Sequence, residues 1–329
     1  MYHFYEILLP KYGNICADLF QFVNEYVIMT ADTPRVIFTE QLLRMPELCL
    51  KQEDCRMYKR ILMLCDLEGV NHVVGVPYEG LLKGTEQWEI ARRQAALELN
   101  AAADALFEAG AETVALWDNH GGSSNIELTD LDQRITVIQP KGPRLSFAAG
   151  AYDCVCFFGY HAMEGTLGGV LAHTMSSKTV QYYKLNGRYI GEVDMDAAIA
   201  ASHGIPSCFF AGGDIACSQA QRAVEGIVTV VTKTELSRNQ AVFRDNEELF
   251  ADIRKKIVEA VQTEIPMRCL QFPCVMEKSF KRVEDAAAYL ARLRSFGMEA
   301  DHPDDDLLGK DAHTVTAVAR DMDAFIKCI

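Results

Sequence analysis

The chain has 329 residues, a formal net charge of -14 at pH 7, and 49% hydrophobic and 24% charged residues. This length can bury a sizeable core and favours two domains, and the composition is that of a soluble globular protein. The acidic balance argues against a surface for nucleic acid or for an anionic membrane, so we expect neither as a partner. No apolar stretch reaches the ~18–20 residues that a membrane span requires.

The 11 cysteines indicate a reducing compartment rather than secretion. Cys65, Cys154, Cys156 and Cys208 lie in apolar strand-like runs, and no CxxC pair occurs. The odd count, the lack of a regular framework and the absence of a signal peptide fit reduced thiols. We therefore expect a cytoplasmic protein with its cysteines in the core.

Residues 1–58 differ from the rest of the chain, because they show some apolar periodicity but no clear motif. We expect an N-terminal extension here, either an accessory helical segment or a stretch that is not native. In the second case the native product starts at Met57, since MYKRILMLCDLEG resembles a start and a first strand directly after it. Both alternatives stay open at this point.

From residue 60 onward, strand and helix patterns alternate, which predicts an α/β protein with a largely parallel central sheet and flanking helices. The Asn186-Gly187 pair is a strong hairpin signal. Strands are expected at Arg60–Leu64, Thr113–Trp117, Ile135–Ile138, Cys154–Phe158, Val180–Leu185, Arg188–Gly191, Pro206–Ala211 and Ile227–Thr232, and helices at Trp88–Ala109 and Met195–His203.

Helical patterns dominate the remainder, at Asn246–Thr263, Val283–Phe296 and Asp311–Phe325. We therefore expect a metal-binding α/β core at 59–234 and a smaller, helix-rich C-terminal α/β domain at 235–329.

Carboxylates and imidazoles come directly after the apolar runs, where the expected strands end. Asp66 and Glu68 are two residues apart, so in a strand both would face one point and repel each other unless a cation lies between them. Each group alone has an ordinary alternative, a solvated acid or a structural histidine. Their repetition favours one shared site for Zn²⁺ or Mn²⁺, because ligands gather at the carboxyl ends of strands in open α/β sheets. The five candidates are Asp66, Glu68, His120, His161 and Glu192.

His173, in GGVLAHTMSS, comes shortly after His161 in a Gly-rich segment. It would reach the same site without being a ligand, as a general acid/base or a group that binds an oxyanion. The alternative is a buried, hydrogen-bonded histidine. Asp214 and Lys233 are secondary candidates, the first to hold a ligating histidine and the second to stabilise charge, and either is equally a surface residue.

Five segments resemble, in order and spacing, the motifs of the D-aminopeptidase family of dinuclear zinc peptidases: CDLEG, ALELNAAADALFEAGAETVALWDNHGG, FFGYHAMEGT, LAHTMSS and NGRYIGE. The resemblance runs from about Met57 through Lys233, and more loosely to the C-terminus. It implies two zinc ions per chain, with Mn²⁺ or another divalent cation as the alternative. It also implies a ring-type homo-oligomer, with a decamer as one candidate.

Carried onto this sequence, the resemblance makes Asp66 the bridging carboxylate and His173 the catalytic histidine. The other ligands it implies are Glu68, His120, His161 and Glu192. Leu64 and Asn119 stand where the family usually has Ser, and neither position supplies a ligand. These two departures alter hydrogen bonds around the ligands rather than the ligand set. Residues 1–56 have no counterpart in the family pattern.

We predict a metal-dependent aminopeptidase that removes N-terminal residues from short peptides or amino-acid amides, peptides with D-amino acids among them. A metal-bridged hydroxide would attack the carbonyl, and His173 would stabilise charge and pass a proton to the leaving amine. One alternative is a dinuclear hydrolase of another small amide or ester. The other is a non-catalytic, metal-stabilised assembly protein, which is disfavoured because structural zinc sites are usually Cys-rich.

Overall fold

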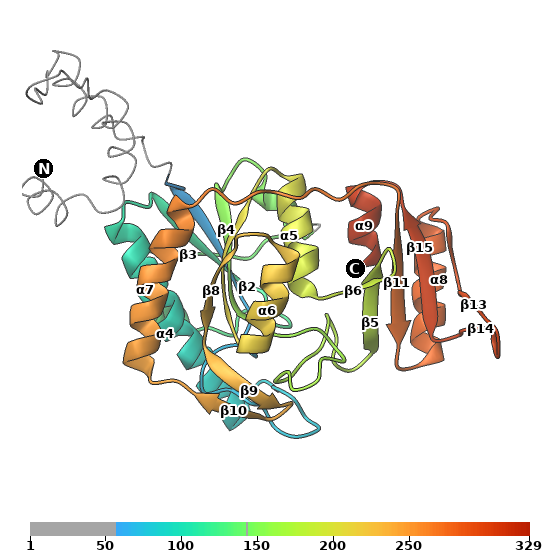
Figure 1. Cartoon of the computed structure of the whole chain (residues 1–329), viewed down its shortest axis with the longest axis horizontal. Helices are drawn as coiled ribbons and strands as arrows, with labels where there is room; N and C mark the ends of the chain where they lie inside the picture. Colours follow the sequence, from blue (N-terminus) through green and yellow to red (C-terminus); the bar gives the residue numbers. More distant parts are fainter. Residues whose placement is uncertain (1–56, 143) are drawn as a thin grey trace, which may run out of the picture. The chain divides into compact units, whose positions relative to one another are not determined.

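The computed structural model describes residues 57–142 and 144–329, and Arg56–Ile329 group into one compact unit (Figure 1). The extension expected at residues 1–58 therefore lies almost wholly outside the described residues, and so does the choice between its two alternatives. Among the described residues, no helix is both long and apolar enough to cross a membrane.

A six-stranded sheet forms the centre of this unit, and every neighbouring pair of strands in it is parallel. In sheet order the strands are β3 (Thr136–Ile138), β2 (Thr113–Asp118), β1 (Arg60–Cys65), β4 (Cys154–Tyr160), β7 (Ser207–Gly212) and β8 (Val228–Val231). Parallel strands covered on both faces read as continuous apolar runs, as ILMLC in β1 and CVCFFGY in β4 do. The predicted α/β fold is confirmed.

Helices cover both faces of the central sheet, and their bounds are α4 (Glu86–Glu108), α5 (Glu192–Ser202), α6 (Asp214–Ala223) and α7 (Asn246–Gln262). Figure 1 shows α4 and α7 on one side of the sheet and α5 and α6 on the other. Polar side chains cap two of them. Thr85 Oγ1 accepts a hydrogen bond from the Trp88 amide at 3.3 Å, and Asp245 accepts from two amides at the start of α7.

A second, antiparallel sheet has five strands, in the order β12 (Ala300–Asp301), β15 (Thr314–Ala319), β11 (Cys274–Phe280), β5 (Val180–Leu185) and β6 (Arg188–Ile190). The remaining elements are the hairpins β9–β10 (Lys233–Ser237, Gln240–Phe243) and β13–β14 (Asp304–Asp305, Gly309–Lys310), the 3-10 turns η1 (Leu128–Asp130) and η2 (Ser146–Ala148), and the helices α8 (Val283–Ser295) and α9 (Met322–Cys328). The division at 234/235 stays a prediction, and this sheet takes strands from both sides of it.

The helix predicted at Asp311–Phe325 is wrong. Thr314–Ala319 forms β15 between β11 and β12, and only Met322–Cys328 is helical. The strand sequence TVTAVA is rich in β-branched residues, which favour a pleated surface, and its apolar spacing also fits a helical period. The pairing with β11, which the sequence pattern did not predict, decides between the two.

Two glycines let the chain after β1 lie directly against the end of β4. The Gly69 amide donates to the Gly159 carbonyl at 2.7 Å, and the Asp66 amide donates to the Phe158 carbonyl at 2.8 Å. A Cβ on Gly69 would lie 1.9 Å from the Tyr160 carbonyl oxygen, and one on Gly159 would lie 2.1 Å from the Asp66 carbonyl oxygen. Glycine is therefore required here for close backbone approach.

We expect Gly69→Ala to lower the free energy of unfolding by roughly 1–3 kcal/mol, because the new methyl group meets backbone that must shift. Urea unfolding monitored by circular dichroism measures this. The matched control is Gly122→Ala, whose Cβ would have no heavy atom within 4 Å. Equal stability of the two variants would show that the approach of the two segments is not tight.

Candidate metal centre

The five candidate ligands and His173 come together in the structure. Asp66 comes directly after β1, Glu68 lies in the next turn, and His161 comes directly after β4. His120 is the second residue after β2, and His173 lies in the loop between β4 and β5. The sixth residue, Glu192, is expected at the end of a strand of the parallel sheet, and it does not lie there. It comes after β6 of the antiparallel sheet and is the first residue of α5.

The first group of possible ligands consists of Asp66, Glu68 and His120. His120 Nδ1 lies 2.9 Å from Asp66 Oδ1 and 3.1 Å from Glu68 Oε2. One ligand atom from each residue lies within 4.8 Å of the others. Two buried carboxylates and an imidazole this close form a cradle of the size and donor type that a divalent cation takes.

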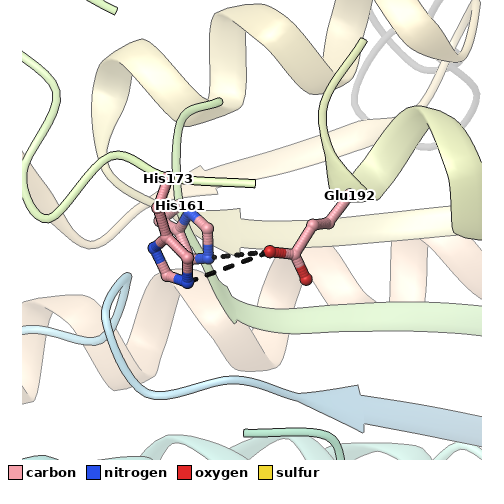
Figure 2. A group of neighbouring side chains, drawn as sticks. All are labelled: His161, His173 and Glu192. Atoms are coloured by element: carbon pink, nitrogen blue, oxygen red, sulfur yellow. Dashed lines mark ion pairs between the residues drawn. The ribbon is translucent and has the colours of Figure 1, made fainter. Parts of the chain in front are cut away.

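The second group consists of His161, His173 and Glu192 (Figure 2). Figure 2 shows both imidazoles facing the Glu192 carboxylate, whose Oε1 lies 3.5 Å from His161 Nε2 and 4.0 Å from His173 Nε2. The two rings stack with centroids 3.9 Å apart and planes at 14°. Each ring also has its Nδ1 against a backbone carbonyl, at 3.0 Å from Ala162 O and 2.9 Å from Leu171 O. Both Nε2 atoms therefore face the site.

Asp66 faces both groups. Its Oδ1 lies 2.9 Å from His120 Nδ1, while its Oδ2 lies 3.5 Å from His161 Nε2. Asp66 therefore offers one carboxylate oxygen to each of the two groups of possible ligands. Within the described residues, the buried His161 Nε2 has no hydrogen-bond partner. An orphaned imidazole nitrogen amid carboxylates is what a cation would satisfy.

The pKa values of two groups in the site are shifted strongly from their usual values. Burial raises the pKa of the Glu192 carboxyl, but the nearby imidazoles of His161 and His173 outweigh burial and lower that pKa to about 2. Burial lowers the pKa of His120, but the Glu68 and Asp66 carboxylates raise it to about 11. Carboxylates buried this way need positive charge beside them.

The same acidic surroundings act on the neighbouring thiol. Cys65 is fully buried, and its Sγ donates to the Asp66 carbonyl at 3.1 Å. Burial, together with the charges of Asp118 and Asp66, raises the pKa of this thiol well above its usual value. Cys65 and the other cysteines of the described residues are free thiols.

Its place in the sequence suggests that Lys233 stabilises charge in the site. In the structure it instead stabilises the backbone of the turn that carries Glu68. Its buried ammonium donates to three carbonyl oxygens, those of Glu68 at 2.6 Å, Val70 at 3.0 Å and Val73 at 2.6 Å. Asp214, the other secondary candidate, accepts from the Glu235 amide at 2.8 Å and so anchors β9 instead of a ligating histidine.

Asp118, which no sequence pattern singles out as a site residue, fixes the loop that carries His120. One of its oxygens accepts from the His120 amide at 3.3 Å, and the other accepts from the Asn125 amide. Asn125 Nδ2 in turn donates to the His120 carbonyl at 2.8 Å. The DNH sequence at the end of β2 could have signalled this, since Asp commonly accepts hydrogen bonds from amides two residues ahead.

We expect Lys233→Met to lower the free energy of unfolding by about 3 kcal/mol, because it leaves three buried carbonyl oxygens without their donor. Lys256→Met is the control, since Lys256 is a half-exposed residue of α7 that forms an ion pair with Glu259, its i+3 neighbour on the same helix. That change should stay within about 0.5 kcal/mol. Denaturant unfolding at one fixed pH compares them, and a Lys233 effect no larger than the control would refute the supporting role.

A parallel-sheet α/β fold with two carboxylate–imidazole groups gathered beside the ends of its strands is typical of a metallohydrolase. A family model described as D-aminopeptidase matches residues 59–320, and the chain belongs to this peptidase family. The resemblance found in the sequence is thereby confirmed.

Two comparisons with individual proteins agree with that assignment. The chain is 27% identical over 184 residues to the D-aminopeptidase of Bacillus subtilis (strain 168), which covers 55% of this chain and 65% of that protein. It also matches the solved structure of the Zn-dependent D-aminopeptidase DppA from Bacillus subtilis, described as a self-compartmentalizing protease. That match has a TM-score of 0.71 and 22% identity, and covers 82% of this chain and 94% of that chain. The two proteins therefore share the fold.

Proposed function

We propose that this protein is a dinuclear zinc-dependent aminopeptidase that removes N-terminal residues, including D-amino acids, from short peptides or amino-acid amides. The single observation that carries the proposal is the Asp66 carboxylate, which faces His120 through one oxygen and His161 through the other. The family assignment and the zinc dependence stated for DppA support it. In this proposal the ligands are Asp66, Glu68, His120, His161 and Glu192.

The donor set fits zinc and fits catalysis better than a structural role. Closed structural zinc sites are usually rich in cysteine, whereas the two groups here contain only carboxylates and imidazoles. Zinc bound here would supply Lewis acidity for the hydrolysis of a carbonyl compound. Mn²⁺ accepts the same ligands, so metal content decides between the two cations.

In this proposal His173 carries a proton during the reaction. Its Nδ1 is held by the Leu171 carbonyl, which leaves Nε2 facing the site, and its side chain is 13% exposed. The stacked ring of His161 fixes its plane. An imidazole held this way can pass a proton to a leaving amine or hydrogen-bond a developing oxyanion. Because Nε2 also lies 4.0 Å from Glu192 Oε1, the same geometry fits a ligand, and experiment must separate the two roles.

We expect His173→Ala to reduce kcat by roughly 10²–10⁴-fold while two metal ions per chain remain bound. Metal content by inductively coupled plasma mass spectrometry and rates on a cleaved substrate measure the two quantities on one preparation. His302→Ala is the control, because His302 bonds the Thr314 carbonyl in the antiparallel sheet. Loss of one metal from the His173 variant would make this residue a ligand.

The function itself is tested on the purified full chain. We expect about two zinc ions per chain and hydrolysis of at least one member of a panel of D- and L-aminoacyl amides and short peptides. Removal of metal with a chelator should abolish activity, and added zinc should restore it. Two bound metals without cleavage on the whole panel would contradict the aminopeptidase proposal, and would favour a hydrolase of another small amide or ester.

We also propose that the chain forms a ring-type homo-oligomer in the cytoplasm. DppA, whose fold it shares, is described as self-compartmentalizing. The free, mostly buried cysteines of the described chain support a reducing compartment.

A further inference from the structure

A chain of hydrogen bonds runs behind the two ligand groups, from Asn119 through Tyr160 to Asp196. Asn119 Nδ2 donates to Tyr160 Oη at 2.9 Å, and the same hydroxyl donates to Asp196 Oδ2 at 2.8 Å. Arg144 completes the chain, since its guanidinium donates to both oxygens of Asp196, from Nη2 at 2.7 Å and from Nε. Tyr160 is 1% exposed and Asp196 is 0% exposed.

Each member of this chain lies close in sequence to a proposed ligand. Asn119 and Tyr160 directly precede His120 and His161. Asp196 lies one turn along α5 from Glu192, the proposed ligand at the start of that helix. These hydrogen bonds therefore join the loop after β2, which carries His120, to the end of β4 and to α5, which supply His161 and Glu192 of the second group.

The donor and acceptor of each hydrogen bond in this series are fixed. A carboxylate can only accept hydrogen bonds, so the Tyr160 hydroxyl is the donor in its hydrogen bond with Asp196. That leaves the oxygen of Tyr160 as an acceptor, and the Asn119 amide supplies the donor. The serine that the family pattern usually has at position 119 carries no Nδ2 and is one bond shorter. The link from the loop to Tyr160 is thus made by the Asn119 amide.

We propose that Asn119, Tyr160 and Asp196 are positioning residues that hold the two ligand groups at a fixed separation, so that zinc affinity depends on the Tyr160 hydroxyl. The inference rests on the proposed metal centre. Hydrogen-bonded partners behind metal ligands typically contribute 10–100-fold to metal affinity, because they hold the ligand in the geometry that binds.

Tyr160→Phe removes the hydroxyl and keeps the ring, which packs edge-on against Phe157 with centroids 5.0 Å apart. We expect its zinc affinity to fall by about 10–100-fold, measured on the metal-free full chain by competition with a chromophoric chelator. Tyr289→Phe is the matched control, since its buried hydroxyl donates to the Cys328 carbonyl at 2.6 Å on α9, away from the ligands. Tyr160→Phe loses the hydrogen bonds with Asn119 and Asp196, and Tyr289→Phe loses the one with Cys328, but only Tyr160→Phe should lose zinc affinity.

Asn119→Ser removes the amide from a partly buried loop position and tests the other end of the chain. We expect a loss of zinc affinity in the same direction, and we expect that loss to disappear when the change is made in the Tyr160→Phe background, because the shared link is already broken. If Tyr160→Phe fails to fold, the affinity of Asn119→Ser alone decides the question, with an unchanged value counting against the inference.

The outcomes separate the two proposals. If the protein without substitutions binds no zinc, that result contradicts the proposed metal centre itself. An unchanged chain that binds two zinc ions, beside a folded Tyr160→Phe variant whose affinity is within twofold, leaves the metal centre standing and overturns the positioning role. Additive effects of the two substitutions would also overturn it.

Discussion

The site depends on the contact between the segment after β1 and the end of β4. At Gly69 and Gly159 the two backbones approach more closely than any side chain would permit. Because Asp66 and His161 come directly after these strands, this contact sets the distance between a carboxylate and an imidazole from segments almost a hundred residues apart. The Lys233 ammonium stabilises the segment after β1 further, because it donates to the carbonyl oxygens of Glu68, Val70 and Val73. Backbone geometry, more than side-chain choice, decides where the Asp66 carboxylate lies.

Much of the fold and the candidate site could be predicted because the relevant signals are local. β1, β2 and β4 are apolar runs that stop at polar residues, and parallel strands bring their carboxyl ends to one edge of a sheet. Asp66, His120 and His161 therefore emerge from pattern alone. The grouping of their side chains in the structure agrees with that prediction, while their role as ligands stays a proposal.

Other features could not be predicted, because long-range contacts leave no periodic trace in a sequence. Lys233 comes after a strand, and nothing in VTKTE indicates that it reaches three carbonyl groups more than a hundred and fifty residues earlier. The link from Tyr160 to Asp196 joins a strand end to a helix in the same hidden way. The sequence of β15 suggests a helix for a related reason: its pairing partner, β11, decides its conformation.

The buried proton of Cys65 has a consequence for the reactivity of this cysteine. The thiolate, and not the thiol, is the form that attacks electrophiles and reacts readily with oxidants. Cys65 is fully buried, and burial together with the charges of Asp118 and Asp66 raises the pKa of its thiol well above the usual value. Although it directly precedes Asp66 in the sequence, Cys65 is therefore an inert packing residue of the core.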